Sequence, residues 1–229
     1  LLGTGKLNTQ LMQQQLNYPV LTTGLILAPR GLGAMVAALV VGRLIMRINP
    51  RYLIVAGLLV NAAALYLLSG ATLDVTPIFY VWIGFVQGIG LGLTFVPLTT
   101  VTFSTLPARL RNEATPIYNL IRNIGSSIGI SIVFTLLTRH IQVNHAQLGE
   151  RLTAFSQPLI QFMHQVPLPR QGAFALLDSE INRQAAMISY NDDFLLMAAL
   201  MLIMVPIALA MHYEFGSGES PEGAQTAME

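Results

Sequence analysis

Five long, almost uncharged apolar runs restrict the possible fold of this chain more than any other feature. A helix needs about 20 mainly apolar residues to cross the hydrocarbon core of a membrane. Only 10% of the residues are charged, whereas a soluble globular chain carries about 25%. The sequence therefore predicts an all-α integral membrane protein with about five full transmembrane helices. The predicted spans are residues 20–44, 52–72, 77–101, 114–138 and 194–213.

The first sixteen residues, LLGTGKLNTQLMQQQL, are too polar to form a complete span. Two interpretations remain open. The segment is either the cut or degraded end of a further membrane helix, which we favour, or a helix that lies at the membrane interface. Residue 1 is leucine and not methionine, so we expect a processed chain, a truncated one or a fragment.

Basic residues in the short loops predict the orientation of the spans. The turn that joins the first two spans, taken with the end of the first as GRLIMRINPR, holds Arg43, Arg47 and Arg51, and Arg109 and Arg111 lie between the third and fourth spans. The turn between the second and third spans has no cation. Because cytoplasmic loops are enriched in arginine and lysine, the two arginine-bearing turns are predicted to be cytoplasmic. The turn between the second and third spans is predicted to lie outside.

These observations divide the chain into five segments. Helical periodicity suggests short helices in the long segment before the last span, and the Gly-, Ser- and Glu-rich end predicts a tail without a packed core. The predicted segments are a partial helix at 1–16, four spans with short loops at 17–138, an outer (periplasmic) loop with short helices at 139–192, the last span at 193–213 and a disordered cytoplasmic tail at 214–229.

The fourth span carries a polar stripe along one face. Thr115, Asn119, Arg122, Ser126 and Gly129 recur at steps of four and three residues, which places them on one side of a helix. A charge near the membrane centre costs at least about 2.5–3.5 kcal/mol, so the stripe is expected to face other helices or water. The arginine either pairs with neighbouring groups and stabilises packing, or it lines a polar translocation cavity.

Three further polar residues of the spans are candidates for such a cavity. Gln87 and Thr94 share a face of the third span, where Gln87 can meet a substrate or a neighbouring helix. Arg30 follows a proline in the first span, and it either enters the cavity or extends its head group to the outer interface.

Glycines at small-xxx-small spacing predict close helix contacts in the membrane. One run is Gly84, Gly88 and Gly92 in the third span, and a second pair is Gly125 and Gly129 in the fourth.

Several function classes are excluded or not supported. The chain has no cysteine, which excludes disulfides, thiolate metal ligands and cysteine nucleophiles. We expect His140, His145 and His164 to be exposed and unpaired, and we predict no metal site. No nucleophile–base–acid arrangement is present, so we expect no enzyme, and a net charge of +1 implies no nucleic-acid partner.

Three separated blocks resemble the C-terminal half of major facilitator superfamily drug exporters, specifically the fourteen-helix EmrB/QacA subfamily. The resemblance covers nearly the whole chain, from about residue 11 to residue 206. The blocks are LTTGLILAPRGLGAMVAALVVGRLIMRINPR, GFVQGIGLGLTFVPLTTVTFSTLPARLRNEATPIYNLIRNIGSSIGIS and RQAAMISYNDDFLLMAAL.

The resemblance assigns two local motifs. Gly42, Leu44 and Arg47 match the superfamily's cytoplasmic loop pattern, glycine-x-leucine-x-aspartate-arginine, although methionine occupies the aspartate position. Asp192 and Asp193 would lie at the outer end of the last helix, close to a helix N-terminus, where negative charge is stabilised.

The resemblance implies proton-coupled efflux of hydrophobic drugs or toxic compounds across the inner (cytoplasmic) membrane by alternating access, with a cytoplasmic C-terminus. The energy source would be the proton gradient, without a cofactor. The implied partners are small hydrophobic substrates, membrane lipids, the N-terminal half and, as for exporters of the EmrB type, a periplasmic adaptor and an outer-membrane channel.

Two alternatives stay open: a non-transporting membrane interaction or scaffold fragment, and an exporter of an endogenous metabolite. Because no carboxylate lies inside the five predicted spans, this half is not expected to hold the proton-binding acid.

Overall fold

The computed structural model describes residues 2–72, 75–104, 106–151 and 170–210. The described part contains helices and turns and no strand, which confirms the predicted all-α fold. The helices in chain order are α1 (Leu2–Gln10), the short π-helical segment η1 (Leu11–Gln15), α2 (Val20–Leu44), α3 (Pro50–Ser69), α4 (Pro77–Ser104), α5 (Ala108–Arg151) and α7 (Arg170–Ala210).

Five of these helices are long and apolar enough to cross a membrane, as the sequence predicted. The bounds of α2 agree with the predicted span, and α3 begins two residues before its predicted start. Asn49 caps α3, because its side chain accepts a hydrogen bond from the backbone nitrogen of Arg51 at 3.3 Å. Pro50 occupies the first turn, where its missing N–H costs nothing.

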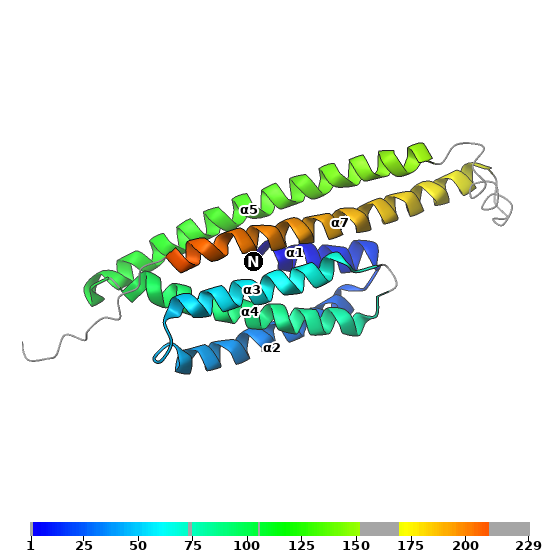
Figure 1. The fold of residues 1–229 in the computed structure, drawn as a ribbon. Coiled ribbons are helices and arrows are strands. Elements are labelled where there is room, and N and C mark those ends of the chain that lie inside the picture. Colours follow the sequence, from blue (N-terminus) through cyan, green and yellow to red (C-terminus); the bar gives the residue numbers. More distant parts are fainter. Residues whose placement is uncertain (1, 73–74, 105, 152–169, 211–229) are drawn as a thin grey trace, which may run out of the picture.

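Helix α4 packs against both α2 and α3 (Figure 1). A Cβ atom at Gly88 would collide with the carbonyl oxygen of Arg30, and one at Gly92 would collide with Ala37. The backbones of α2 and α4 therefore approach more closely than a larger residue would permit. This confirms the close contact predicted from the α4 glycines.

Helix α1 lies within the bundle and not on its surface. Leu7, Leu11 and Met12 are fully buried in one apolar core with Tyr190 and Phe194 of α7. All three figures that show the whole chain place α1 beside α7. This position shows that α1 packs as part of the helical bundle.

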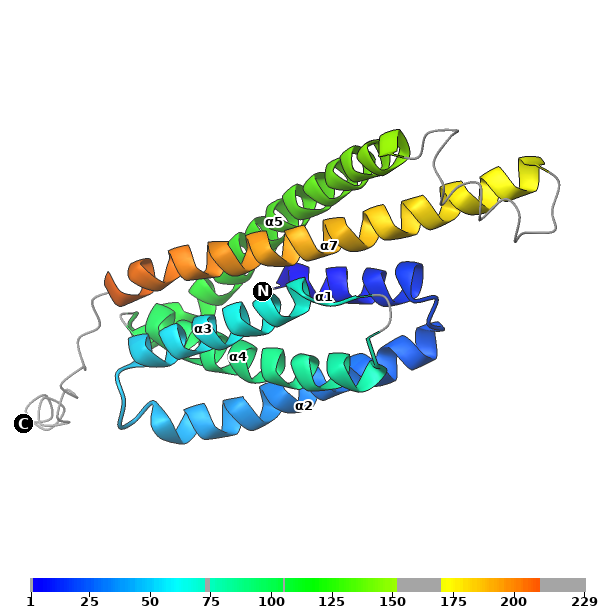
Figure 2. The ribbon, with the colours of Figure 1, turned by 45° about the vertical axis from the view of Figure 1, so that its right-hand side comes forward.

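Helices α5 and α7 form a long pair that extends beyond the other helices (Figure 2). Short helices were predicted within residues 139–192, but α5 continues to Arg151 and α7 already begins at Arg170. That prediction is wrong for the described residues, because a helix need not end where its sequence ceases to be apolar. The predicted tail, 214–229, lies outside the described residues.

The outer surface of the bundle is strongly apolar. On α2 alone, Leu21, Leu25 and Leu39 expose 78%, 67% and 59% of their surface. Soluble proteins rarely expose contiguous apolar surface of this kind. Together with the five long apolar helices, this surface identifies a multi-pass membrane protein.

Candidate functional site

Four polar side chains meet between α1, α2 and α4, and we call them the interior polar cluster: Thr4, Asn8, Arg30 and Gln87. Arg30 Nη2 donates a hydrogen bond to Thr4 Oγ1 at 2.9 Å. Asn8 Nδ2 donates to Gln87 Oε1 at 3.2 Å. Thr4, Asn8 and Gln87 are 1%, 3% and 0% exposed, so the cluster lies inside the bundle.

The local sequence explains how these side chains meet. Thr4 and Asn8 are four residues apart on α1 and therefore share one helix face. Gln87 precedes Gly88, the glycine against which the backbone of Arg30 packs. The absence of a side chain at Gly88 thus allows Arg30 to lie beside Gln87's helix.

The interior polar cluster has unused hydrogen-bonding capacity. Among the described residues, the buried atoms Asn8 Oδ1 and Gln87 Nε2 have no hydrogen-bond partner. Buried polar atoms are normally paired, so these two atoms offer one acceptor and one donor to a water or to a polar group of a guest.

Sequence reasoning found Arg30 and Gln87 but missed their partners. Thr4 and Asn8 belong to the first sixteen residues, whose polarity predicts an incomplete span. In the structure this polarity serves contacts with Arg30 and Gln87 inside the bundle. Gln87 was expected to meet either a substrate or a neighbouring helix, and in the structure it contacts Asn8 of helix α1. Arg30 was expected to enter the cavity or to extend to the outer interface, and in the structure its head group turns inward to Thr4 of α1.

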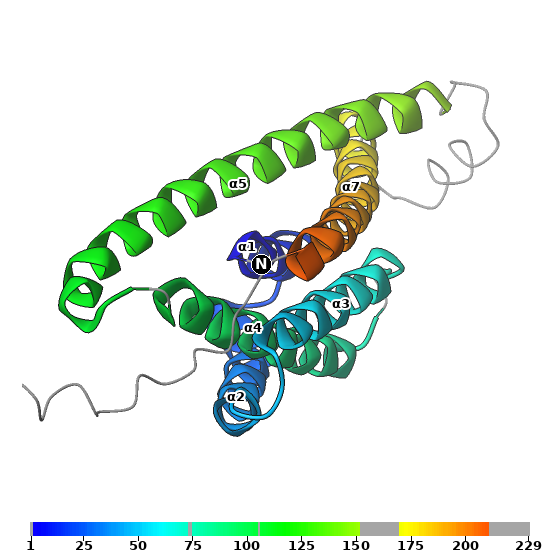
Figure 3. The ribbon, with the colours of Figure 1, turned by 60° about the vertical axis from the view of Figure 1, so that its left-hand side comes forward.

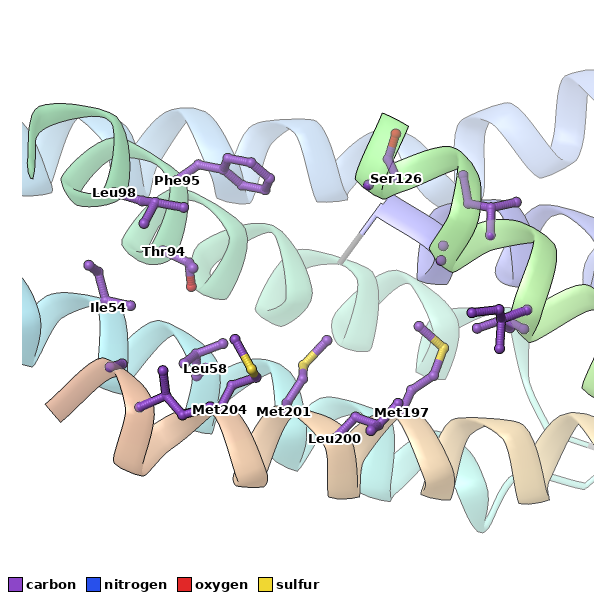
Figure 4. Close-up of a pocket in the computed structure, with 18 of the residues that line it drawn as sticks. Ile54, Leu58, Thr94, Phe95, Leu98, Ser126, Met197, Leu200, Met201 and Met204 are labelled. Carbon is purple, nitrogen blue, oxygen red and sulfur yellow. The ribbon is translucent and has the colours of Figure 1, made fainter. Parts of the chain in front are cut away.

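An apolar cavity of about 560 Å³ opens between α3, α4, α5 and α7 (Figure 4). Its α7 wall contains three methionines whose side chains point toward α4 in the figure. Thr94 is 5% exposed and contributes to the α4 wall, with its hydroxyl donating to the Gly90 carbonyl at 2.8 Å. The principal lining residues are Phe95, Leu98, Ser126, Met197, Met201 and Met204.

The predicted stripe on α5 reaches this cavity only in part. Ser126 lines it, and the guanidinium carbon of Arg122 lies 4.7 Å from the centre of the Phe95 ring, a cation–π contact. Asn119 is exposed. Arg122 is exposed and does not itself line the cavity, but it contacts Phe95, which does.

The glycines of α5 do not make the close helix contact that their spacing predicted. A Cβ atom at Gly125 or Gly129 would meet nothing within 4 Å, and both residues line the cavity. They leave space along the wall instead of bringing a second helix near (Figure 3 shows α5 apart from α4).

The loop motif lies at the end of α2. Gly42 and Leu44 belong to its last turn, and Arg47 lies in the following turn, where it is exposed. Met46, at the position of the family's aspartate, is 81% exposed.

Asp192 and Asp193 lie far from the N-terminus of their own helix. Helix α7 begins at Arg170, roughly six turns earlier, and the stabilising effect of a helix N-terminus is confined to its first turn. The predicted stabilisation of these carboxylates by the helix end is therefore wrong. Asp192 is exposed, whereas Asp193 is 1% exposed and contacts His140 of α5, with 3.2 Å between Nδ1 and Oδ1.

The histidines also differ from expectation. His140 and His145 were predicted to be unpaired, but His145 Nε2 lies 3.1 Å from Asp178 Oδ1, and His140 contacts Asp193. His164 lies outside the described residues. The described part of the chain holds no group of three or more His, Cys, Asp or Glu side chains suited to a metal ion.

The geometry supports non-covalent binding. The cavity can hold an apolar body, and Gly3, which lines it, belongs to the same helix as Thr4 and Asn8 of the interior polar cluster.

The chain matches the family model described as Major Facilitator Superfamily over residues 7–141. It is 28% identical over 220 residues to the multidrug export protein EmrB of Escherichia coli (strain K12), covering 94% of this chain and 43% of that protein. The probable multidrug resistance protein EmrY of the same strain is 30% identical over 212 residues, with 90% and 41% covered. The fatty acid resistance protein FarB of Neisseria gonorrhoeae is 27% identical over 220 residues, with 95% and 43% covered. The chain thus spans less than half the length of these relatives.

Proposed function

Because this chain belongs to the major facilitator superfamily, we propose that it forms the C-terminal half of an exporter that removes small hydrophobic compounds from the cell by alternating access. The names of its relatives, two of them multidrug proteins, support this proposal. The shared region of under half of each relative is the size expected of one half of such a transporter.

The apolar cavity is the observation that carries the proposal. Its volume of about 560 Å³ lies within the range of roughly 300–1,000 Å³ typical of small-molecule sites. Methionine side chains are flexible and polarisable, so they adapt to guests of different shapes. Met197, Met201 and Met204 therefore suit a site that accepts varied hydrophobic compounds.

The remaining parts of the proposal rest on the basic residues of the turns and on the resemblance to the family. The spans cross the cytoplasmic membrane, with the arginine-bearing turns and the C-terminus in the cytoplasm. A second, N-terminal half completes the pathway, because facilitators carry substrate at the interface of two halves. The proton gradient supplies the energy, and a periplasmic adaptor and an outer-membrane channel receive the substrate.

The test places a side chain in the cavity at a position where no other helix contacts an added Cβ atom. Gly129 lines the cavity and has space for a side chain, so Gly129→Leu in the complete transporter should occupy the site. Gly24 of α2 is exposed and equally unobstructed but lies outside the cavity, so Gly24→Leu is the matched control. The measurement is accumulation of a fluorescent hydrophobic dye in cells, together with the amount of transporter in the membrane.

We expect Gly129→Leu to abolish dye export at normal abundance and Gly24→Leu to preserve it. Normal export by the Gly129→Leu transporter would refute the role of the cavity. Absence of export by the unmodified complete transporter, for dyes and drugs alike, would refute the exporter proposal itself.

A further inference from the structure

We propose that Asp193 and His140 form a proton-binding site in this half, which links the proton gradient to the cavity. The inference rests on the proposed exporter function, because a proton site has a transport role only in a transporter. It also revises the expectation that no acid of this half binds the proton. That expectation placed Asp193 at the outer end of the last span, whereas α7 continues through this residue.

The adjacent carboxylates Asp192 and Asp193 of α7 stand in contrasting surroundings. Asp192 is exposed, but the side chain of Asp193 is only 1% exposed, while that of His140 is 35% exposed. Asp193 Oδ1 contacts His140, and Oδ2 is buried without a partner among the described residues. A buried carboxylate charge is costly unless it is well paired, so this environment favours a group that can take up a proton.

Neighbouring contacts hold α7 in this position. The Asn144 side chain of α5 donates to Ser189 Oγ at 2.9 Å, and the Asn191 side chain donates to the Ala71 carbonyl at 2.9 Å. The hydroxyl of Tyr190, one turn from Asp193, is buried without a recorded partner in the described structure. The site is therefore a buried contact between two helices with unpaired polar atoms beside it, and not a surface ion pair.

Few other charged groups face Asp193. His140 faces it from α5, and Tyr190 and Asp192 are its titratable neighbours on α7 itself. On α3, which also packs against α7, the single charged residue is Arg51, at the opposite end of that helix from Ala71. Burial is therefore the largest influence on the protonation of Asp193, and His140 is its principal charged neighbour among the described residues.

The pair provides a route from solvent to the buried carboxylate. In the unloaded state, neutral His140 donates its Nδ1–H to ionised Asp193, a tautomer that we assign from the contact. A proton from water binds at Nε2 of the half-exposed imidazole. The Nδ1–H bond then breaks as an Oδ1–H bond forms, which leaves neutral histidine and a neutral carboxylic acid. The net change is one proton gained and one negative charge removed.

The position along α7 fits a proton entering from outside. Asp193 lies 17 residues before Ala210, or about 26 Å at 1.5 Å per residue, and the hydrocarbon core is about 30 Å thick. With the C-terminus in the cytoplasm, the pair lies near the outer boundary of the membrane. Met197, one turn further along α7, already lines the cavity, so the proton site and the cavity share one helix.

The test compares matched pairs of variants in the complete transporter, purified and reconstituted into lipid vesicles. The variants are Asp193→Asn with Asp192→Asn as control, and His140→Gln with His145→Gln as control. One measurement follows ethidium transport driven by an imposed pH gradient and the proton flux that ethidium evokes. A second records the infrared band of protonated carboxyl groups as pH is varied, which does not require transport.

We expect Asp193→Asn to lose gradient-driven transport and evoked proton flux while retaining ethidium exchange without a gradient. It should also lose one titrating carboxyl band, and Asp193→Glu should restore both signals. His140→Gln should shift the pH at which that band titrates, and both controls should resemble the unmodified protein. The Asp193→Glu variant and the exchange measurement separate a specific loss from misfolding.

Two results would overturn the inference: an unchanged carboxyl band in Asp193→Asn, or proton-coupled transport by that variant. If the unmodified transporter moved no substrate, the exporter proposal would fail, yet the infrared titration would still decide whether Asp193 binds the proton.

Discussion

The contact between α2 and α4 at Gly88 provides a prediction whose magnitude follows from the structure. A Cβ atom in Gly88→Ala would overlap the Arg30 carbonyl oxygen and lie 2.9 Å from the Ala34 backbone nitrogen. Ordinary contacts between such atoms are about 3.5–4.0 Å. Both obstructing atoms belong to the backbone of α2, so no side-chain rotation can relieve the overlap and the two helices must separate.

The cost should resemble that of other overpacked interiors, about 1–3 kcal/mol of unfolding free energy. Gly31→Ala is the matched control, because Gly31 lies on the same helix α2, is exposed and has nothing within 4 Å of an added Cβ. Detergent-unfolded membrane helices remain helical, so the greater helix propensity of alanine largely cancels. The control should therefore change stability by at most about 0.5 kcal/mol, as other surface substitutions do.

The assay is reversible unfolding of the purified chain in mixed micelles, with both variants measured beside the unmodified protein. Separation of α2 from α4 would also move Arg30 relative to Gln87, so drug export by the complete transporter should decrease in Gly88→Ala. Equal stability of the Gly88→Ala and Gly31→Ala proteins would show that the backbones do not approach as described and would refute the reasoning.

Two further predictions concern the polar groups. Gln87→Leu should reduce the free energy of unfolding by about 0.6–2 kcal/mol, the range of hydrogen bonds between membrane helices. In a double-mutant cycle with Asn8→Leu, the stability losses of the two single variants should not add. Additive losses would show that the pair does not interact. Arg122→Leu should reduce export at normal membrane abundance, whereas Arg122→Lys should retain part of it because a cation remains over the Phe95 ring; a protein that fails to accumulate would indicate a packing role instead.

The spans could be predicted from the sequence because lipid imposes a composition that is visible over 20 residues. Helix α2 agrees with its predicted bounds, and α4 extends only three residues further. Prediction from apolar composition fails where a helix continues beyond its apolar residues. Residues 139–151 and 170–193 are polar enough to resemble a loop, yet they are helical and joined by side-chain contacts such as that between Asn144 and Ser189.

The candidate site was predictable only residue by residue. A glutamine or arginine inside a span is conspicuous, so Gln87 and Arg30 could be found without coordinates. Their partners could not, because Thr4 and Asn8 gain significance only when α1 packs beside α2 and α4. Asp193 was assigned to a helix end for the same reason: its burial depends on α5, about fifty residues earlier in the chain.

Helix α7 contains neither proline nor glycine between Phe174 and Met204, and those residues are the usual causes of a kink. At 1.5 Å per residue this portion is a stiff rod of about 45 Å, which exceeds the thickness of the hydrocarbon core. One end of the rod forms a cavity wall, and the other projects past the rest of the bundle. Any tilt imposed on the projecting end, by a ligand, an antibody or a neighbouring protein, must therefore displace the methionines of the wall and change the shape of the cavity.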